Sequence, residues 1–326
     1  MNSNIKNRDF IGLMDFSKED LEGILELAEE IKGGRKDVST FLENKHIGLL
    51  FSVASTRTRI SFQVGIRQMG GYAEFLSSKD LQLVYHESLK DTAAVMSRYL
   101  DALVVRMYDM TQYGKGREAL NLIAEHTDIP LINALDDKEH PCQVLGDILT
   151  IKEKFGEDYR NKKLVFTWGY SWRQKSPGVP HSMMIAASLL GMNVTLAYPE
   201  GFDLDREYVD FARKTAASSG AKLEFSHDLM EASENADVIY VKSWKALNLT
   251  TEEDQRIREQ EQIKDKWCVC DEHFKRANPG AYFMNCLPII RGEQATADII
   301  DGSHSIIYDE AENRLHIQKA ILAALM

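Results

Sequence analysis

The chain has few cysteines and no long apolar run. Its 326 residues include 4 cysteines without the spacing of a disulfide framework, so we expect a soluble protein of the reducing cytoplasm. The apolar runs are far shorter than the ~20 residues of a transmembrane helix, and the first residues carry no apolar core of a signal peptide. Cys268 and Cys270 have no second pair to complete a zinc site. We assign both to packing and predict no metal.

Basic residues and glycine-rich nucleotide motifs are also scarce. The chain has 39 Lys and Arg against 50 Asp and Glu, a formal net charge of −11, which argues against nucleic acid as a partner. It contains neither a Gly-x-Gly-x-x-Gly turn nor a Walker loop. The segment 167–171 follows a predicted strand but has one glycine, a poor dinucleotide fingerprint. These absences argue against an NAD oxidoreductase.

One stretch, Ser55–Arg59, combines three hydroxyls and two guanidiniums at a predicted strand-to-helix junction. Ile47–Val53 reads as a buried strand, and Phe62, Ile66 and Met69 have the spacing of one helix face. The first N–H groups of a helix have no internal partner and attract anions, and hydroxyl and guanidinium groups bind phosphate oxygens. An N-capped surface helix with two solvated arginines is the ordinary alternative. The composition favours a phosphate site.

Three stretches together carry a resemblance to a known family. Ser55–Arg59 resembles the carbamoyl phosphate signature of the aspartate and ornithine carbamoyltransferases. His140–Gln143 resembles the second signature of that family, and Asn285–Pro288 nearly matches the third. The correspondence runs from about Phe16 to the C-terminal helix, which is essentially the whole chain.

The chain reads as two similar parallel-sheet α/β domains joined by inter-domain helices. We predict a carbamoyl phosphate-binding domain at 1–150, joined by a C-terminal helix at 310–326, and an acceptor-binding domain at 151–309. The resemblance alone implies that the last helix returns to the first domain. The predicted strands are 47–53, 72–76, 102–106, 130–133, 164–167, 194–197, 223–225, 238–241 and 281–284, with a short sixth element of the second series at 306–308.

Carbamoyl transfer requires that the phosphate is held, the carbonyl is polarised and the carbamoyl NH2 is oriented for attack by an amine. Phosphate is already a good leaving group, so we predict no cofactor. By resemblance the catalytic residues are Arg106, His140, Thr58 and Arg314. The resemblance also implies that carbamoyl phosphate is bound by Ser55, Thr56, Arg57, Thr58, Arg106, His140, Gln143, Cys286, Leu287 and Arg314.

The roles of these residues follow from the chemistry of the family. Charge develops on the carbonyl oxygen in the transition state, and His140, Thr58 and Arg106 would stabilise it as an oxyanion site. Gln143 would accept from the carbamoyl NH2. Ordinary explanations exist too, since Arg106 could end a sheet edge and His140 could cap a helix. Cys286 could be a small buried side chain, and we assign it no role as a nucleophile.

The acceptor region departs from ordinary ornithine enzymes, which carry an Asp-x-x-x-Ser-Met-Gly segment. Here Val241–Leu247 stands in that place, and a proline-containing loop, 172–180, follows Trp168. Both features resemble the knotted branch, which includes N-acetylornithine and N-succinylornithine carbamoyltransferases. The resemblance implies a deep knot in the second domain, with the segment after Lys242 passing through this loop.

Three positions differ from the usual pattern of that branch. Asn285 stands where the third signature begins with histidine, Gln294 where N-acetylornithine enzymes have lysine, and Gln82 where they have tryptophan. Lys242 and Arg291 are the cations expected to hold the acceptor carboxylate. The predicted acceptor-binding residues are Lys242, Arg291, Gln82 and Trp168.

The sequence therefore predicts a carbamoyltransferase of amino-acid metabolism that acts in arginine biosynthesis. Its substrates would be carbamoyl phosphate and an ornithine-like, N-acylated amino acid. The loop containing Gln82 aligns with a family loop that enters a neighbouring subunit, so the resemblance implies a homotrimer with shared active sites. The alternatives are an ordinary ornithine carbamoyltransferase, an enzyme for a different amine, and a homologue that binds carbamoyl phosphate without catalysis.

Overall fold

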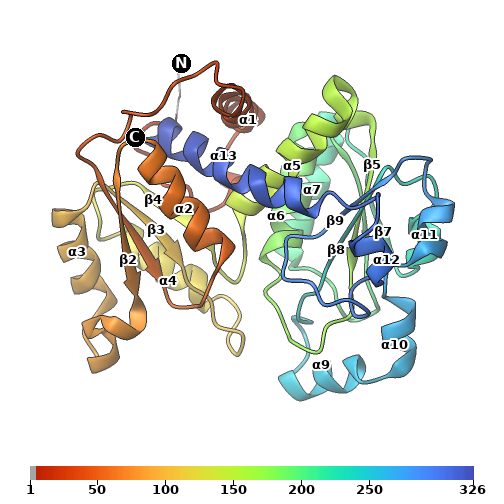
Figure 1. Cartoon of the computed structure of the whole chain (residues 1–326). Coiled ribbons are helices and arrows are strands. Elements are labelled where there is room, and N and C mark those ends of the chain that lie inside the picture. The colour runs from red at the N-terminus through yellow and green to blue at the C-terminus, as the bar shows by residue number, and fades with distance from the viewer. Residues whose placement is uncertain (1–4) are drawn as a thin grey trace. The chain divides into compact units, whose positions relative to one another are not determined.

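The protein, here as a computed structural model, is described over residues 5–326, and these form two compact units. Unit 1 runs to Leu149 and resumes at Glu312–Met326, while unit 2 is Thr150–Ala311. Each unit is built around one parallel sheet (Figure 1). The predicted α/β class with two parallel-sheet domains is confirmed.

The sheet of unit 1 has four strands in the order β2-β1-β3-β4. They are β1 (His46–Phe51), β2 (Tyr72–Ser77), β3 (Ala102–Arg106) and β4 (Leu131–Leu135). β1, β3 and β4 are almost entirely buried, which explains why their sequences are continuous apolar runs rather than alternating patterns. The N-terminal segment pairs with the outer edge of this sheet through a bridge between Phe10 and Ile132.

Helices cover the sheet of unit 1 and connect the two units along the chain. They are α1 (Lys18–Lys32), α2 (Arg57–Gln68), α3 (Leu89–Tyr99), α4 (Lys115–Ala124), α5 (Pro141–Phe155) and α13 (Ile307–Leu325), with short 3-10 turns η1 (Leu13–Asp15), η2 (Ser78–Asp80) and η3 (Gln82–Tyr85). Side chains of α3 and α4 pack on one face of the sheet, where Leu50, Leu103 and Leu131 join Met96 and Ile123 in one apolar cluster. α5 and α13 each carry the chain from one unit into the other.

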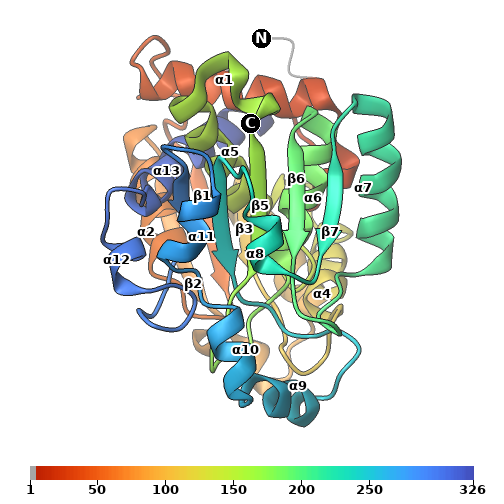
Figure 2. The ribbon, with the colours of Figure 1, turned by 90° about the vertical axis from the view of Figure 1, so that its right-hand side faces the viewer.

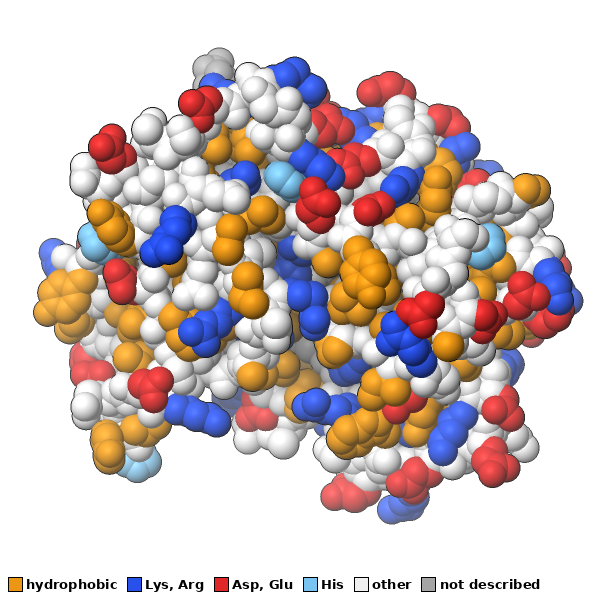
Figure 3. Space-filling model, in the orientation of Figure 1, with side chains coloured by type: hydrophobic (Ala, Val, Ile, Leu, Met, Phe, Trp, Pro, Cys, Tyr) orange, Lys and Arg blue, Asp and Glu red, His pale blue; other side chains and the backbone are white. Residues whose placement is uncertain are grey.

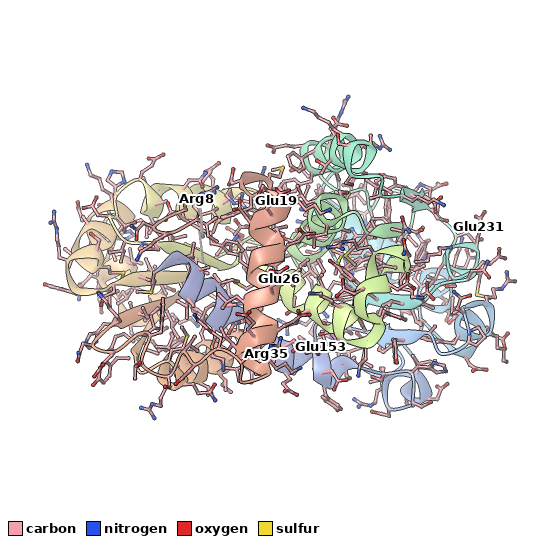
Figure 4. The ribbon with its side chains drawn as sticks, turned by 90° about the horizontal axis from the view of Figure 1, so that it is seen from above. Arg8, Glu19, Glu26, Arg35, Glu153 and Glu231 are labelled. Atoms are coloured by element: carbon pink, nitrogen blue, oxygen red, sulfur yellow. The ribbon has the colours of Figure 1, made fainter. Side chains whose placement is uncertain are left out.

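α1 illustrates how local sequence sets a helix boundary. The Ser17 hydroxyl accepts from the Asp20 N–H, and the Asp20 carboxylate accepts from the Ser17 N–H, which forms a capping box. In Figure 4 the labelled Glu19 and Glu26 lie along α1, and Arg35 lies just beyond its end. All three are exposed, while the apolar side of the helix is buried.

The sheet of unit 2 has five strands in the order β7-β6-β5-β8-β9. They are β5 (Lys163–Trp168), β6 (Asn193–Ala197), β7 (Leu223–Ser226), β8 (Val238–Lys242) and β9 (Tyr282–Met284). Its helices are α6 (Gly178–Leu190), α7 (Arg206–Ser219), α8 (Leu229–Ala232), α9 (Thr251–Arg258), α10 (Glu261–Lys266), α11 (Asp271–Arg276) and α12 (Ala297–Ile300), with a 3-10 turn η4 (Gly156–Asn161). Figure 2 shows α7 on one side of this unit, and α11 and α12 on the opposite side.

Two local expectations differ from the structure. The short sixth element predicted at 306–308 is wrong as a separate element, because Ile307 already begins α13. The stretch 77–86, predicted as a loop, contains the two turns η2 and η3. In both places the sequence is too short for a period to distinguish a strand, a turn and a helix start.

Within residues 5–326, none of the helices combines the length and the apolar content that crossing a membrane requires. On the face shown in Figure 3, acidic and basic side chains are interspersed. The acidic excess of the chain is thus mixed with positive charge on this face.

Candidate active site

The predicted carbamoyl phosphate residues of unit 1 gather at one edge of its sheet. Parallel strands end at the same edge, and β1, β3 and β4 are neighbours. Ser55–Arg59 follows β1, Arg106 is the last residue of β3, and His140 comes shortly after β4. Ligands of open α/β sheets bind at this carboxyl edge.

The first turn of α2 is not capped by the side chain that precedes it. The helix begins at Arg57, and the side chain of Thr56 makes no capping hydrogen bond. Thr58, in the first turn of α2, is only 2% exposed. A helix start without a side-chain cap, next to hydroxyl and guanidinium groups, is suited to bind an anion.

Arg314 connects two of the predicted signatures. Its Nη2 donates to the Thr58 Oγ1 at 2.9 Å, and its Nη1 donates to the Gln143 Oε1. Gln143 in turn donates from Nε2 to the Asp147 Oδ1 at 2.7 Å. All four side chains are at least 98% buried. The chain of bonds fixes the orientation of the Thr58 hydroxyl and of the Gln143 amide.

Three guanidinium groups influence one another at this edge. Burial lowers the pKa of Arg106, and the positive charges of Arg314 and Arg57 lower it further, while Tyr108 opposes them. The Arg106 Nε is buried, and within residues 5–326 no hydrogen-bond partner reaches it. Positive charges brought together with a buried unpartnered donor are costly without an anion. This arrangement is therefore suited to a phosphate dianion.

A tight acidic turn positions His140. The Asp136 carboxylate accepts from the main-chain N–H groups of Lys138 and Glu139, which folds the chain just before His140. Asp137 accepts from the N–H groups of Gly114, Gly116 and Arg117 and so caps the start of α4. The sequence analysis missed this turn, although three acids directly before a signature histidine are a visible signal.

Glu139 is the most perturbed acid of this turn. Its Oε2 accepts from the Leu13 N–H at 2.9 Å, and Arg117 lies 3.5 Å from its Oε1 and also pairs with Asp136. Burial raises the pKa of Glu139 to about 7, against the opposing effect of Arg117. A group that ionises near neutral pH thus lies directly beside His140 in the chain.

Two of the predicted acceptor residues, Trp168 and Lys242, lie at the carboxyl edge of the sheet of unit 2, and so does Asn285 of the third signature. Trp168 ends β5, Lys242 ends β8, and Asn285 follows β9 directly, and these three strands are neighbours. Lys242 is 8% exposed, and its Nζ donates to the Ser243 carbonyl at 2.8 Å. A lysine held at this depth is suited to meet a carboxylate.

The Asn285 side chain uses both its amide nitrogen and its amide oxygen in hydrogen bonds. Its Nδ2 donates to the Val241 carbonyl at 2.7 Å and to the Gln294 Oε1 at 3.0 Å. Its Oδ1 accepts from the Leu287 N–H at 2.7 Å. Leu287 has φ 54°, a left-handed conformation that a leucine adopts only when its surroundings hold it there. Asn285 therefore holds the backbone of the third signature at Leu287.

Three other predicted residues have surroundings that bear on their roles. Trp168 is fully buried, and its indole N–H donates to the Trp244 carbonyl at 2.9 Å, so its ring belongs to the core. Arg291 is exposed, and its Nε donates to the Asp301 Oδ2 at 2.7 Å. Gln82 begins η3 and lines a hollow of about 470 Å³ in unit 1.

Two residues of unit 2 matter more than the sequence suggested. Gln294 is 1% exposed, and its Nε2 has no hydrogen-bond partner in the described part of the chain. Arg258 is fully buried, although its spacing from Asp254 is that of an ordinary surface pair on a helix. The sequence offered no signal that either would be inside. Across the described chain, no three side chains of His, Cys, Asp or Glu come together as a metal site.

Two family models match this chain. The carbamoyl-P binding domain of aspartate/ornithine carbamoyltransferase matches residues 8–153, and the Asp/Orn binding domain of the same family matches residues 162–325. The chain belongs to the aspartate/ornithine carbamoyltransferase family. The prediction of a carbamoyltransferase is confirmed.

Curated relatives carry the name of the ornithine branch. The ornithine carbamoyltransferase of Halalkalibacterium halodurans is 40% identical over 99% of this chain and 96% of its own. That of Symbiobacterium thermophilum is 42% identical over 99% of both chains.

Solved structures of both branches resemble this fold. An acetylornithine transcarbamylase complexed with acetylcitrulline has a TM-score of 0.90 at 36% identity, over 98% of this chain and 99% of that one. The ornithine carbamoyltransferase from Pyrococcus furiosus has a TM-score of 0.87 at 38% identity, over 99% and 98%. The predicted resemblance to the knotted branch thus has a structural counterpart.

Proposed function

We propose that this protein transfers the carbamoyl group of carbamoyl phosphate to the side-chain amine of an ornithine-like amino acid whose α-amino group is acylated. The observation that carries the donor half is the group of Arg57, Arg106 and Arg314 around the uncapped start of α2. Its positive charge and hydrogen-bond donors complement the negative charge and acceptor oxygens of an acyl phosphate.

The residues of the first two signatures, together with Arg106, would have different roles in the reaction. Ser55–Arg57 and the α2 amides would hold the phosphate oxygens. Thr58, His140 and Arg106 would donate to the carbonyl oxygen, where negative charge develops. The neutral acceptor amine would attack the carbonyl carbon, forming a C–N bond. The C–O bond to phosphate would then break, with phosphate leaving with the electron pair and taking up the proton that the amine gives up.

The carbamoyl NH2 needs acceptor groups. Gln143 would offer its amide oxygen, which already accepts from Arg314 and has a second lone pair. The main-chain carbonyls at Cys286 and Leu287, held by Asn285, would complete the set. No cofactor is required by this mechanism.

The proposal for the acceptor amino acid rests on cationic and amide side chains of unit 2. The proposed acceptor has a free carboxylate, for which Lys242 and Arg291 would be the partners. Arg291 would have to exchange its contact with Asp301 for the substrate. The buried, unpartnered Nε2 of Gln294 would donate to the carbonyl of an N-acyl group, since such a donor is costly when left unpaired. Trp168 would act through packing beneath this region.

The trimer and the role of Gln82 also belong to this proposal. Apolar side chains are exposed on unit 1 around η3 and α3, as expected of a surface that another subunit covers. They are Tyr72, Val84, Tyr85, Val95 and Tyr99, at 55%, 49%, 76%, 49% and 76% exposure. We propose a cytoplasmic homotrimer in which the Gln82 loop contributes to a neighbouring active site.

The decisive experiment incubates the protein with carbamoyl phosphate and each of L-ornithine, N-acetyl-L-ornithine and N-succinyl-L-ornithine. The carbamoylated product is measured directly and phosphate release in parallel. An N-acylated ornithine should give the highest kcat/KM. If free L-ornithine is the best acceptor, the protein is an ordinary ornithine carbamoyltransferase. Binding of carbamoyl phosphate without turnover of any amine would contradict the proposed catalysis.

Two variants test the acceptor cation. Arg291→Met should raise the acceptor KM by roughly tenfold or more, because a charged hydrogen bond is lost, and should leave carbamoyl phosphate binding unchanged. Asp301→Asn is the matched change, since it frees Arg291 from its present partner and should not raise that KM. An acceptor KM untouched by Arg291→Met would refute this role.

A further inference from the structure

Arg258 is a fully buried arginine whose donors all converge on one part of unit 2. It lies at the end of α9 with no exposed surface. Its Nη1 donates to the Ser171 carbonyl and to the Ser243 Oγ, each at 3.0 Å. Its Nη2 donates to the Trp244 carbonyl at 2.7 Å. One guanidinium thus joins the loop after β5 to the segment after β8.

Asp254, one turn earlier on α9, completes the arrangement. It pairs with Arg258 through both carboxylate oxygens. Its Oδ2 also accepts from the Ala246 N–H at 2.9 Å, and its Oδ1 accepts from the Gln174 Nε2 at 2.9 Å. The pair therefore bonds to the main chain on both sides of Lys245.

The bonds of this pair hold the segment Lys242–Ala246 from several directions. Ser243, Trp244 and Ala246 are completely buried. The Trp244 carbonyl accepts from Trp168 as well as from Arg258, and the Lys245 N–H donates to the Lys175 carbonyl at 2.9 Å. Lys242 at its start is tied to Ser243, so a shift of Ser243 would move the Lys242 ammonium.

A buried ion pair is weak evidence of a gain in stability, because well-packed apolar residues often replace one without loss. What apolar residues cannot replace is directional bonding to specific carbonyl, hydroxyl and amide groups. All five groups bound by this pair, at Ser171, Gln174, Ser243, Trp244 and Ala246, belong to two chain segments next to the proposed acceptor cation. Their common effect is to fix the geometry of that cation.

We propose that the buried Arg258–Asp254 pair is a positioning unit that holds the segment Lys242–Ala246 in its acceptor-binding conformation before the acceptor arrives. This inference rests on the proposed function, in which Lys242 meets the acceptor carboxylate. A segment ordered in advance loses less conformational entropy on binding. Arg258 touches no substrate and acts only through the segment that it holds.

Arg258→Lys keeps the charge and removes the planar fork. It should lower kcat/KM for the best acceptor of the panel by about tenfold or more, since small displacements of a positioning group have effects of that order. Calorimetric titration with carbamoyl phosphate should give an unchanged affinity. Ser243→Ala, which removes a single hydroxyl and should fold, is expected to give a smaller loss of the same kind. Arg256→Lys is the matched control, because Arg256 is exposed on the same helix.

Hydrogen exchange supplies a readout that needs no acceptor. The amides of Lys245 and Ala246 are bonded in the free protein and should exchange slowly. In Arg258→Lys and Ser243→Ala they should exchange faster, while peptides from β6 stay protected. Faster exchange together with the acceptor defect supports a positioning role.

The double variant Arg258→Met with Asp254→Leu separates positioning from stability. Apolar substitution of both partners should preserve folding and still weaken acceptor use. Wild-type acceptor kinetics and wild-type exchange in this double variant, or in Ser243→Ala if the double does not fold, would overturn the proposal. If the wild-type protein carbamoylates none of the three amines, the proposed function fails. The exchange experiment then still decides whether the pair orders the segment.

Discussion

Arg314 of α13 donates a hydrogen bond to Thr58 in the first turn of α2, across 256 positions of sequence and 2.9 Å of space. The same guanidinium reaches Gln143 of the second signature. Two signatures that are far apart in the chain are therefore oriented by one residue that belongs to neither. Thr58, which we propose as an oxyanion donor, and the Gln143 amide, which we propose as the partner of the carbamoyl NH2, are thus oriented together.

Arg314→Lys should lower kcat on the order of tenfold to a hundredfold. Lysine keeps the charge but is a point donor, and it does not reproduce a fork that bonds to two side chains at once. Steady-state kinetics with saturating acceptor measures the effect. Arg67→Lys, on the exposed side of α2, is the control. A kcat within twofold of wild type in Arg314→Lys would contradict the assigned role.

Arg57→Ala and Arg106→Ala should impair the use of carbamoyl phosphate in different ways. Loss of Arg57 removes charged hydrogen bonds to phosphate, so affinity should fall by roughly tenfold or more. Loss of Arg106 also removes stabilisation of the developing oxyanion, so kcat should fall by about a hundredfold or more. Calorimetry and kinetics separate the two, with circular dichroism to confirm folding. Normal binding and turnover in both variants would show that the anion site lies elsewhere.

Glu139→Gln should change how stability depends on pH. Burial raises the pKa of Glu139 from 4.5 to about 7, so the folded state binds a proton that the unfolded state releases above pH 4.5. The contribution of Glu139 to stability is present below pH 4.5 and is lost as the pH rises towards 7. The variant lacks this slope, and its free energy of unfolding relative to wild type should therefore increase across that window.

Urea unfolding at several pH values between 4.5 and 7.5 measures this difference. Glu26→Gln, on the exposed face of α1 shown in Figure 4, is the control and should follow the wild-type curve. A constant offset between Glu139→Gln and wild type across the window would mean that Glu139 does not titrate there.

Asn285→Ala should reduce kcat by about tenfold while costing about 1–3 kcal/mol of stability. The Leu287 N–H and the Val241 carbonyl lose their partner, and Leu287 is no longer held in its left-handed conformation. Kinetics and thermal unfolding check the two effects. Asn121→Ala, on the exposed side of α4, should affect neither. An unchanged kcat would show that the third signature keeps its geometry without Asn285.

The strands were predictable because β1, β3, β5 and β8 are continuous apolar runs, and burial on both faces of a parallel sheet requires such runs. Ser55–Arg59 could be singled out from its place between a predicted strand and a predicted helix, whereas Arg106, His140 and Arg314 were assigned by resemblance to the family. Contacts between distant side chains were not predictable. Nothing local distinguishes the buried Arg258 from a surface arginine, or the Gln294 amide from a solvated one.

The knot in the second domain stays a prediction. Lys245 bonds to Lys175 in the loop before α6, and Arg258 bonds to Ser171 just ahead of it, so the two segments concerned are neighbours. The loop is shorter than the predicted 172–180, because α6 already begins at Gly178. Threading is a property of the whole path and not of these contacts. To test it, the ends of unit 2 can be linked chemically and the protein then unfolded in denaturant. A knot in a chain with linked ends cannot untie, so it would persist in the unfolded state.

The return of the chain to unit 1 through α13 has a consequence during synthesis. The Asn7 N–H donates to the Leu325 carbonyl at 2.7 Å, and Arg314 lies on the same last helix. When the strands of both sheets have emerged from the ribosome, the nascent chain still lacks Arg314, the residue that orients Thr58 and Gln143. The capacity to hold carbamoyl phosphate should therefore appear only after the part of α13 that carries Arg314 has been synthesised.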